Sequence, residues 1–390
     1  MPTGDDSAQR GVVATLAKGG RGIVRSPAGA VFVAGVIPGE EIEFRVLPER
    51  RGAALQGRLL RVLNPSPDRV PPPCPHYGRC GGCNLQHLSY PGQLSGKRQI
   101  LASNLMRLGG FPDGLVIETI SSPPWRSRTH AEFRWIDRQA GFYRRGSHEL
   151  EPVEDCLLVP EVVARWLKEV SLPGRVGESG EVAVVTDGSQ LAARLMLAER
   201  VIPCDSLPAV DFSIAPFRLR VRPGTFVQAN RFLLESMHRL VREVVHPLAP
   251  QRVVDLFAGS GFFTLPLAEE AGQVMAVEAV AAHGEQLREN IEANALTNVS
   301  WRIQDALTTA PPPADLYLVD PPRGGLSPRL IRHLVAVSPR AILYFSCDSA
   351  TLARDLRQFG PLGYRPGRVV MLDNFPQTDH LETFVLLEPS

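Results

Sequence analysis

The sequence predicts an α/β protein with a small N-terminal β-barrel, a central α+β domain and a C-terminal doubly wound sheet. Apolar strands alternate with helical stretches from about residue 223 to the end, which is typical of a mostly parallel, Rossmann-like sheet. Between residues 11 and 63, five short apolar runs are each broken by Gly- or Pro-containing turns. That pattern favours a closed, OB-like barrel.

The chain has 390 residues, which is enough for two or three domains at ~100–200 residues each. The proline-rich segment NPSPDRVPPP, residues 64–73, predicts a boundary after the barrel. We therefore expect domains at 1–66, 67–222 and 223–390. The middle domain should contain a helix over 91–110 and strands over 129–136, 181–187, 191–197 and 217–223.

Charge is unevenly distributed, although the net charge is only +1. Residues 1–150 carry 20 Lys/Arg and 12 Asp/Glu (+8), and the remaining 240 carry 22 and 29 (−7). A basic front half favours contact with nucleic acid. In PPWRSRTHAEFRW we expect Arg126, Arg128, His130 and Arg134 to alternate along one strand and face the same side. The alternative is a solvated face paired with Glu132.

The N-terminal residues MPTGDDSAQR are polar and acidic, and no apolar signal segment follows them. No apolar run approaches the ~18–20 residues of a membrane span. We therefore expect a cytoplasmic protein without membrane attachment. Nothing in the sequence indicates an obligate protein partner.

The stretch DLFAGSGFFTLPLA, residues 255–268, predicts a strand, a glycine turn and a helix that could approach a nucleoside cofactor. A dinucleotide fingerprint needs a third glycine where Thr264 stands, so NAD is disfavoured. Glu278 ends the next strand, 23 residues after Asp255, at the offset of a ribose-binding carboxylate. Asp305 ends a further strand and could accept an adenine amino group. These features favour S-adenosylmethionine.

Two further strand ends carry reactive groups. DPPR, residues 320–323, places Asp320 and Arg323 after a strand but lacks the aromatic ring expected for amino-methylation of a base. Cys347 ends the next apolar strand, and Glu382 opens the last one. A thiolate that adds to carbon 6 of uracil makes carbon 5 nucleophilic, and a carboxylate can later remove the carbon-5 proton. A packed cysteine and a solvated glutamate are the alternatives.

Together these motifs resemble the RNA uridine carbon-5 methyltransferases, in particular the iron–sulfur members with an N-terminal TRAM domain. The matching stretches are CPHYGRCGGC, GFYRRGSHEL, FVQAN, DLFAGSG, DPPRGG, SCDSATLARDL and FPQTDHLE. The resemblance implies that Cys347 is the nucleophile and Glu382 the base. It implies a cofactor site of Gln228, Phe257, Glu278, Asp305 and Asp320, and contact of the target uracil with Gln228, Asp320 and Arg323.

The sequence departs from the family at three places. Asp348-Ser349 replaces a common Asn-Pro, Phe262 stands where many members have Asn, and Asp305 stands where some have Asn. The change at Phe262 removes any side-chain hydrogen bond from that position to the methionine part of the cofactor.

The cysteines of CPHYGRCGGC, with the spacing C-x5-C-x2-C, predict a metal site. Thiolates suit zinc and iron–sulfur equally, but zinc sites prefer shorter C-x2-4-C pairs. We expect a closed, structural 4Fe-4S cluster, as in the resembling family. Its ligands would be Cys74, Cys80, Cys83 and Cys156.

The expected activity is methylation of a specific uridine at carbon 5 through a covalent cysteine adduct. The base must leave its stack, so a loop or single-stranded RNA is the expected substrate, anchored by the TRAM-like barrel together with Arg126 and Arg128. The resemblance favours 23S rRNA over tRNA. The alternatives are a non-catalytic RNA-binding or redox-sensing iron–sulfur protein and a non-covalent amino-methyltransferase.

Overall fold

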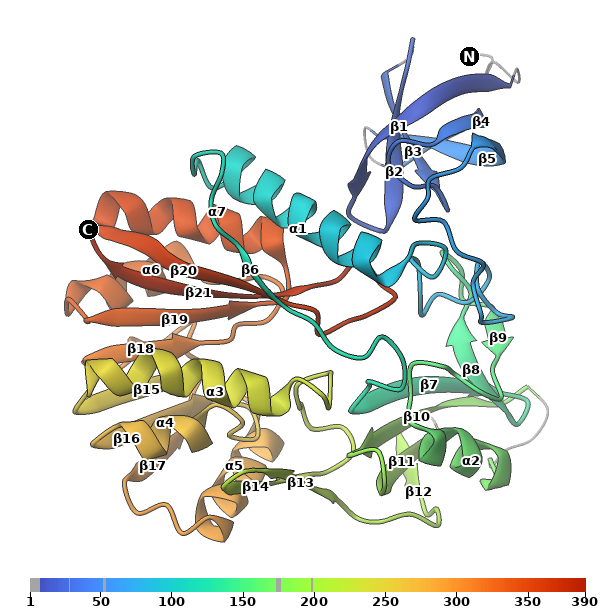
Figure 1. The fold of residues 1–390 in the computed structure, drawn as a ribbon. Coiled ribbons are helices and arrows are strands. Elements are labelled where there is room, and N and C mark those ends of the chain that lie inside the picture. Colours follow the sequence, from blue (N-terminus) through green and yellow to red (C-terminus); the bar gives the residue numbers. More distant parts are fainter. Residues whose placement is uncertain (1–7, 28, 52–53, 173–176, 198) are drawn as a thin grey trace. The chain divides into compact units, whose positions relative to one another are not determined.

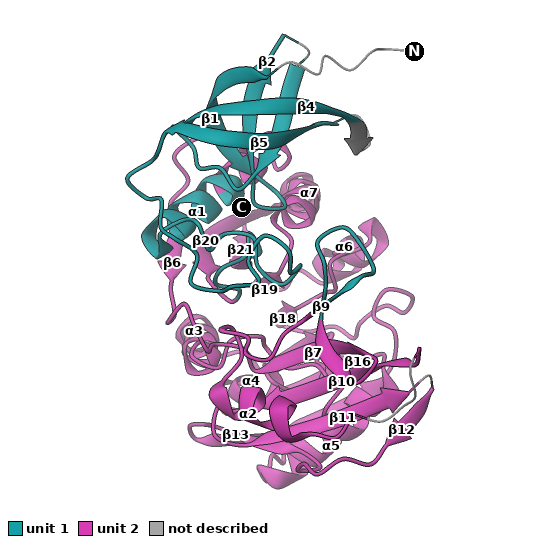
Figure 2. Ribbon diagram, turned by 90° about the vertical axis from the view of Figure 1, so that its right-hand side faces the viewer, with its two compact units in different colours: residues 1–101, 142–151, 375–380 teal, residues 102–141, 152–374, 381–390 magenta. Residues whose placement is uncertain are grey.

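The computed structural model (Figure 1) describes residues 8–27, 29–51, 54–172, 177–197 and 199–390. These residues form two compact units, which Figure 2 colours separately. One unit contains residues 1–101, 142–151 and 375–380, and the other contains 102–141, 152–374 and 381–390.

The first unit contains the predicted five-stranded closed barrel, with strand order β1-β2-β3-β5-β4. Its interior is a cluster of buried aliphatic side chains around Phe44. Gly57 lies on the inner side of β5, where an added Cβ would come within 2.8 Å of Val31 and Val33, so glycine lets the strands close around these side chains. The strands are β1 Gln9–Ala17, β2 Arg21–Ser26, β3 Gly29–Ala34, β4 Glu41–Arg51 and β5 Ala54–Asn64.

The middle of the chain forms the predicted mixture of strands and helices. Helix α1 spans Tyr90–Arg107, close to the expected 91–110. A six-stranded sheet has the order β12-β11-β10-β7-β8-β9, and β13 pairs with β14 in a separate hairpin. These elements are β7 His130–Ile136, β8 Gln139–Tyr143, β9 Leu150–Pro152, α2 Glu161–Glu169, β10 Ser179–Thr186, β11 Leu191–Leu197, β12 Arg200–Ile202, β13 Val210–Ile214 and β14 Phe217–Val221.

The eight-stranded sheet of the second unit confirms the doubly wound prediction. Its order is β17-β16-β15-β18-β19-β21-β20-β6. Strands β15 to β19 are parallel, whereas β21 runs antiparallel to both of its neighbours. The strands are β6 Glu118–Ile120, β15 Arg252–Leu256, β16 Gln273–Glu278, β17 Val299–Ile303, β18 Leu316–Val319, β19 Ala341–Ser346, β20 Tyr364–Leu372 and β21 Glu382–Pro389.

Helices flank this sheet, with α3 packed beside α4 and α6 beside α7 (Figure 1). The sequence caps two of them clearly. The Ser327 hydroxyl accepts a hydrogen bond from the Leu330 N–H at the start of α6, and the Asp348 carboxylate accepts from two N–H groups at the start of α7. The helices are α3 Leu234–Val245, α4 Thr264–Glu270, α5 Ala281–Ala293, α6 Pro328–Ala336 and α7 Ser349–Phe359.

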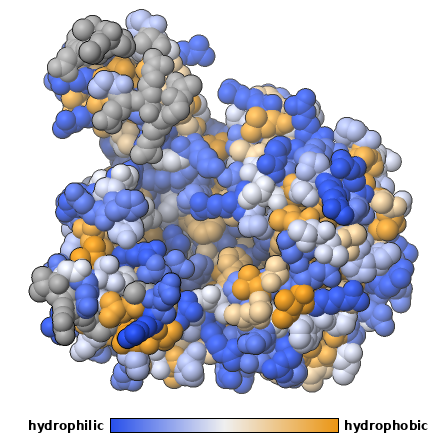
Figure 3. All heavy atoms as spheres, turned by 180° about the vertical axis from the view of Figure 1, so that it is seen from behind, coloured by the Kyte–Doolittle hydropathy of each residue, from blue (hydrophilic) through white to orange (hydrophobic). Residues whose placement is uncertain are grey.

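The surface is mixed in character. Hydrophobic side chains form small groups among hydrophilic ones on the face that Figure 3 shows. No helix within the described ranges is both long and apolar enough to cross a membrane.

Replacing Phe345 by alanine should destabilise the second unit strongly. Phe345 is fully buried, stacks on Phe263 with ring centroids 4.2 Å apart, and lies 5.0 Å from the Phe384 ring. The resulting cavity should lower the free energy of unfolding by about 3–5 kcal/mol, as measured by urea denaturation. The control Leu362→Ala removes a side chain that is 38% exposed. It should change the free energy of unfolding by less than about 0.5 kcal/mol.

Candidate active site at one edge of the sheet

The candidate site lies at the carboxyl ends of the parallel strands. Glu278 ends β16, Phe257 follows β15, Asp320 follows β18 and Cys347 follows β19. The strand order reverses between β15 and β18, and ligands bind at such a switch point in open α/β sheets. The fold therefore brings four sequence-predicted residues to one edge.

Cys347 and Glu382 meet through the register of an antiparallel strand pair. Strand β21 pairs with β19 so that Ser346 faces Thr383. Continuing this register by one residue places Cys347 opposite Glu382. On the other side of β21, Leu372 at the end of β20 pairs with Glu382. The glutamate is 4% exposed and the cysteine is half-buried, so both groups are partly or fully removed from water.

Two side-chain amides form a hydrogen-bonded chain from the segment after β20, which lies beside Glu382, to Asp320. Gln228 Nε2 donates to Asp320 Oδ2 at 2.9 Å, and Asn374 Nδ2 donates to Gln228 Oε1 at 3.2 Å. The Thr129 hydroxyl donates to the Gln228 carbonyl at 2.6 Å and fixes the backbone there. Asn374 was not predicted from the sequence, because a single Asn after a strand usually marks a turn.

The Asp355 carboxylate fixes the loop that carries Arg323. Asp355 is a second functional residue that was not predicted from the sequence. The buried Asp355 carboxylate accepts hydrogen bonds from the Tyr344 hydroxyl (2.7 Å) and the Leu326 N–H (2.8 Å). Gly325 has φ +74°, and an added Cβ would lie 2.3 Å from Asp355 Oδ2. Glycine is therefore required at Gly325, and the loop is fixed close to the thiol.

The residues predicted to hold a nucleoside cofactor form a suitable cradle. The Glu278 carboxylate accepts N–H groups of Gly259 and Val280, both at 2.8 Å, so its position is fixed. Phe257 adopts φ +65° in the turn after β15, and such strained backbone is common at ligand sites. The buried Asp255 Oδ1 has no hydrogen-bond partner. These features fit a bound nucleoside, which would meet a fixed carboxylate beside an open glycine turn.

The structure around Asp305 and Phe262 limits what these two positions can contribute to a cofactor site. Asp305 lies two residues beyond β17, is exposed, and accepts the Leu307 N–H at 2.8 Å, so one of its carboxylate oxygens already serves the local turn. Phe262, the family departure, is buried and packs on His238 with ring centroids 4.5 Å apart. Its ring therefore fills the core.

Burial governs the ionisation of the reactive groups. Desolvation raises the pKa of Cys347 to about 11, and the charges of Glu382 and Asp320 add to the rise while Arg323 opposes it. Desolvation also raises the pKa of Asp320 and of Asp255 to about 7 each. The pKa of Glu382 is well above its usual range, because of burial and then the charge of Asp320. The resting site therefore favours a protonated thiol.

The pKa of Glu278 is shifted in the opposite direction, below its usual value. Burial raises its pKa, but the neighbouring His283 and the N–H groups of Val280 and Gly259 outweigh that effect, so the pKa is lowered. His283 Nδ1 lies 3.7 Å from Glu278 Oε1. Glu278 is therefore ionised at neutral pH and can accept hydrogen bonds.

The four cysteines expected to bind a cluster are all half-buried. Cys74, Cys80 and Cys83 belong to the first unit and Cys156 to the second. The Gly82 N–H donates to Cys80 Sγ at 3.4 Å. Within the described ranges, no three His, Cys, Asp or Glu side chains are arranged to hold a metal ion. The cluster therefore remains a prediction.

The expected row of basic residues on one strand is wrong for Arg126 and Arg128, because β7 begins only at His130. Arg126 has φ +54° and donates to Asp155 Oδ1 at 2.7 Å and to the Cys156 carbonyl at 2.9 Å. Its guanidinium thus fastens the segment around Cys156. Arg134 pairs with Glu181 on the adjacent strand.

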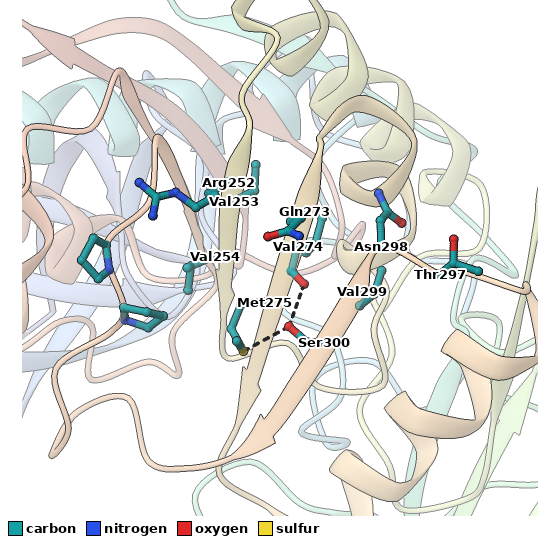
Figure 4. Close-up of a pocket in the computed structure, with 12 residues that line it drawn as sticks. Arg252, Val253, Val254, Gln273, Val274, Met275, Thr297, Asn298, Val299 and Ser300 are labelled. Atoms are coloured by element: carbon teal, nitrogen blue, oxygen red, sulfur yellow. Dashed lines mark hydrogen bonds between the residues drawn. The ribbon is translucent and has the colours of Figure 1, made fainter.

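Two pockets of the second unit contain none of the predicted site residues. Figure 4 shows one of about 360 Å³ at the amino ends of β15, β16 and β17, lined by Met275, Asn298 and Ser300 among others and by none of the predicted site residues. A smaller pocket of about 180 Å³ is lined by Phe226, His130 and His283. Because His283 neighbours Glu278, this second pocket adjoins the predicted cofactor cradle.

A doubly wound sheet whose predicted cofactor residues lie at its switch point is typical of Rossmann-like methyltransferases. The family model described as tRNA (Uracil-5-)-methyltransferase matches residues 205–309 and 314–390. The crystal structure of Pyrococcus abyssi tRNA (uracil-54, C5)-methyltransferase with S-adenosyl-L-homocysteine has the same fold, with a TM-score of 0.77 and 23% identity. The match covers 97% of this chain and 99% of that one.

Relatives of higher identity extend over nearly the whole chain. The 23S rRNA (uracil(1939)-C(5))-methyltransferase RlmD of Pseudomonas aeruginosa is 36% identical, over 97% of this chain and 94% of the relative. The enzymes of the same name from Pseudomonas entomophila and Cronobacter sakazakii are 33% and 35% identical, over 97% and 95% of this chain and 93% of each relative. The chain belongs to the RNA uracil-5 methyltransferase family.

Alkylation of Cys347 by iodoacetamide should be slow at neutral pH and rise steeply with pH. With a pKa of about 11, only about one thiol in a thousand is ionised at pH about 8. Arg323→Ala should slow the reaction further, because Arg323 lowers that pKa. Peptide mass spectrometry would follow the site, with Arg365→Ala as a distant control. Fast alkylation at neutral pH would contradict the raised pKa of the Cys347 thiol.

Proposed function

We propose that this enzyme transfers a methyl group from S-adenosylmethionine to carbon 5 of a specific uridine in 23S rRNA. The observation that carries the proposal is the placement of Cys347 and Glu382 on adjacent strands at the edge that also carries the cofactor cradle. A thiol and a carboxylate on adjacent strands can supply a nucleophile and a proton acceptor for one pyrimidine ring.

The proposed chemistry uses the chain's own residues for the covalent and proton-transfer steps. The Cys347 thiol first releases its proton to water. The thiolate then adds to carbon 6, and the ring electrons move to carbon 5 and O4. S-adenosylmethionine supplies the methyl group when bound. The Glu382 carboxylate then takes the carbon-5 proton, the C–H pair re-forms the ring double bond, and the carbon–sulfur bond breaks to release Cys347.

The predicted cofactor residues divide the binding between them. Glu278, ionised and fixed by two backbone N–H groups, would accept the ribose hydroxyls, and Asp305 would meet the adenine. Phe257, Gln228 and Asp320 would line the remainder of the cofactor site. Gln228, Asp320 and Arg323 would also face the uracil.

Ribosomal RNA is favoured over tRNA as the substrate. Relatives at 33–36% identity over nearly the full chain carry 23S rRNA names, whereas the tRNA-modifying structure is 23% identical. The +8 charge of residues 1–150 and the exposed Arg25 and Arg58 on the barrel support contact with RNA phosphates through the domain at 1–66. Arg128 would add to it, whereas the Arg126 guanidinium is bonded to Asp155 and the Cys156 carbonyl. A uridine in a loop or single strand would cost least to extrude.

Cys347→Ala should abolish 5-methyluridine formation, with a loss of at least about a thousandfold, because no other group can activate carbon 5. Glu382→Gln should still form the covalent adduct but release it slowly. RNA carrying 5-fluorouridine should trap wild-type protein as a covalent adduct, because carbon 5 then carries fluorine in place of the proton that the base must remove. The control Cys204→Ala lies outside the site and should behave as wild type. Full activity of Cys347→Ala would overturn the mechanism.

We also propose that the domain at 67–222 holds a closed 4Fe-4S cluster on Cys74, Cys80, Cys83 and Cys156. The N–H···S contact at Cys80 is the type of bond that stabilises a ligating thiolate. Arg126, which donates to the Cys156 carbonyl, would hold the fourth ligand in position. The cluster's chemical contribution would be structural.

Protein purified without oxygen should contain iron and acid-labile sulfide in equal amounts and absorb broadly in the visible range. Cys83→Ser should lose both iron and colour and unfold at lower temperature. Cys204→Ser is the matched control, because Cys204 is also half-buried but is not part of the motif. Bound zinc without sulfide would contradict the cluster.

A further inference from the structure

Asn374 occupies a special position next to the proposed base. It lies two residues beyond the end of β20, whose Leu372 pairs with Glu382 at the start of β21. Its own N–H donates to the Leu372 carbonyl at 2.9 Å. Only 1% of Asn374 is exposed, so its amide is fully enclosed in the group of catalytic side chains.

The direction of the hydrogen bonds fixes how this amide is turned. Gln228 Nε2 donates to the Asp320 carboxyl, so Gln228 Oε1 is left to accept. Asn374 must therefore present its NH₂ group, and Nδ2 lies 3.2 Å from Gln228 Oε1. Asn374 follows Leu372, the residue that pairs with Glu382, so its side chain lies close to the Glu382 carboxyl and lowers the pKa of that group against the effect of burial. The amide therefore donates to Gln228 and lies beside Glu382.

Packing alone does not account for an amide at this place. Asn374 Oδ1 is buried and has no hydrogen-bond partner, and such a group costs folding free energy. A leucine has nearly the same shape and would avoid that cost. The NH₂ group is therefore explained by its place, because it donates to the glutamine that binds Asp320 and lies beside the proposed base.

We propose that Asn374 is a positioning residue that holds the Glu382 carboxylate for removal of the carbon-5 proton and couples it to the Gln228–Asp320 pair. This inference rests on the proposed function. In the step concerned, Glu382 gains the proton, the C–H electron pair forms the carbon 5–carbon 6 double bond, and the carbon–sulfur bond to Cys347 breaks. Asn374 should therefore matter for release of the adduct and not for its formation.

The surroundings of Glu382 determine the sign of the pH effect. Asp320 and Arg323 come from the loop after β18, Cys347 from the end of β19, and Asp373 from the segment after β20. The negative charge of Asp320 raises the pKa of Glu382, and Asn374 opposes it. Without the amide donor, a smaller fraction of Glu382 is ionised at a given pH, so the loss should be greatest at low pH and should diminish as pH rises.

The test is a single-turnover reaction of the full-length protein with methyl-labelled cofactor and substrate RNA, stopped in denaturant. Asn374→Leu should accumulate a methylated protein–RNA adduct that resolves at least about tenfold more slowly than in wild type, a modest part of what a general base contributes. Adduct formation should keep its wild-type rate. Asn374→Gln, which retains the NH₂ group, should restore part of the release rate.

Thr383→Val is the matched control. Thr383 follows Glu382 directly, is fully buried, and its hydroxyl also has no hydrogen-bond partner, but its side chain points to the other face of β21. This variant should release the adduct at the wild-type rate at every pH. It therefore separates general damage near the base from loss of the Asn374 amide.

Release by Asn374→Leu at the wild-type rate across the pH range would overturn the inference, as would equal slowing in Thr383→Val. If Asn374→Leu does not fold, Asn374→Asp is the replacement variant, because aspartate keeps the shape of asparagine and its ionised carboxylate cannot donate a hydrogen bond. Slow release of the adduct that persists at high pH would then support the inference. Release at the wild-type rate would refute the inference. Wild-type protein that forms no 5-methyluridine would instead refute the proposed function.

Discussion

The antiparallel insertion of β21 between β19 and β20 is the constraint on which the site depends. A wholly parallel sheet would start its last strand at the far edge, remote from the carboxyl ends where Asp320 and Cys347 lie. Because β21 runs the other way, its first residue, Glu382, lies at the carboxyl end of β19. Backbone hydrogen bonds of a ladder thus determine the distance between the proposed nucleophile and the proposed base, and flexible side chains contribute little to it.

The same insertion creates an electrostatic problem that the neighbouring residues moderate. Asp255, Asp320 and Glu382 are all buried, the charge of Asp320 acts on both of the others, and burial raises the pKa of each. Gln228 and Asn374 donate hydrogen bonds into this group, and Arg323 lowers the pKa of Cys347. The polar chain from Asp320 to Glu382 therefore combines mechanical positioning with control of protonation, which explains why buried amides stand where a core would hold aliphatic side chains.

The periodicity of the sequence predicted much of this arrangement. The barrel, the parallel strands and the positions of Glu278, Asp320, Cys347 and Glu382 at strand ends follow from short apolar runs and the residues that end them. The order of the strands did not follow. Nothing local in Glu382–Pro389 says that this strand inserts between two others, since pairing depends on contacts distant in sequence.

Other failures have equally local causes. Arg126 was expected on a strand because charged residues alternate there, but its positive φ and its bonds to Asp155 and the Cys156 carbonyl place it in a turn. Asn374 and Asp355 were missed because single polar residues have no periodic signal, and their importance appears only when their partners, Gln228 and Tyr344, are brought beside them. Phe262 shows the reverse case, a departure from the family that the core absorbs.

The most direct test of the central claim follows the hydrogen that the proposed base removes. RNA labelled with tritium at carbon 5 of its uridines should release one tritium into water for each methyl group that wild-type protein transfers. Replacement of Glu382 by glutamine should allow methyl transfer while most of the tritium stays on the RNA. Methylation by the wild-type protein with the tritium fully retained would contradict attack through carbon 5 and, with it, the role assigned to the paired thiol and carboxylate.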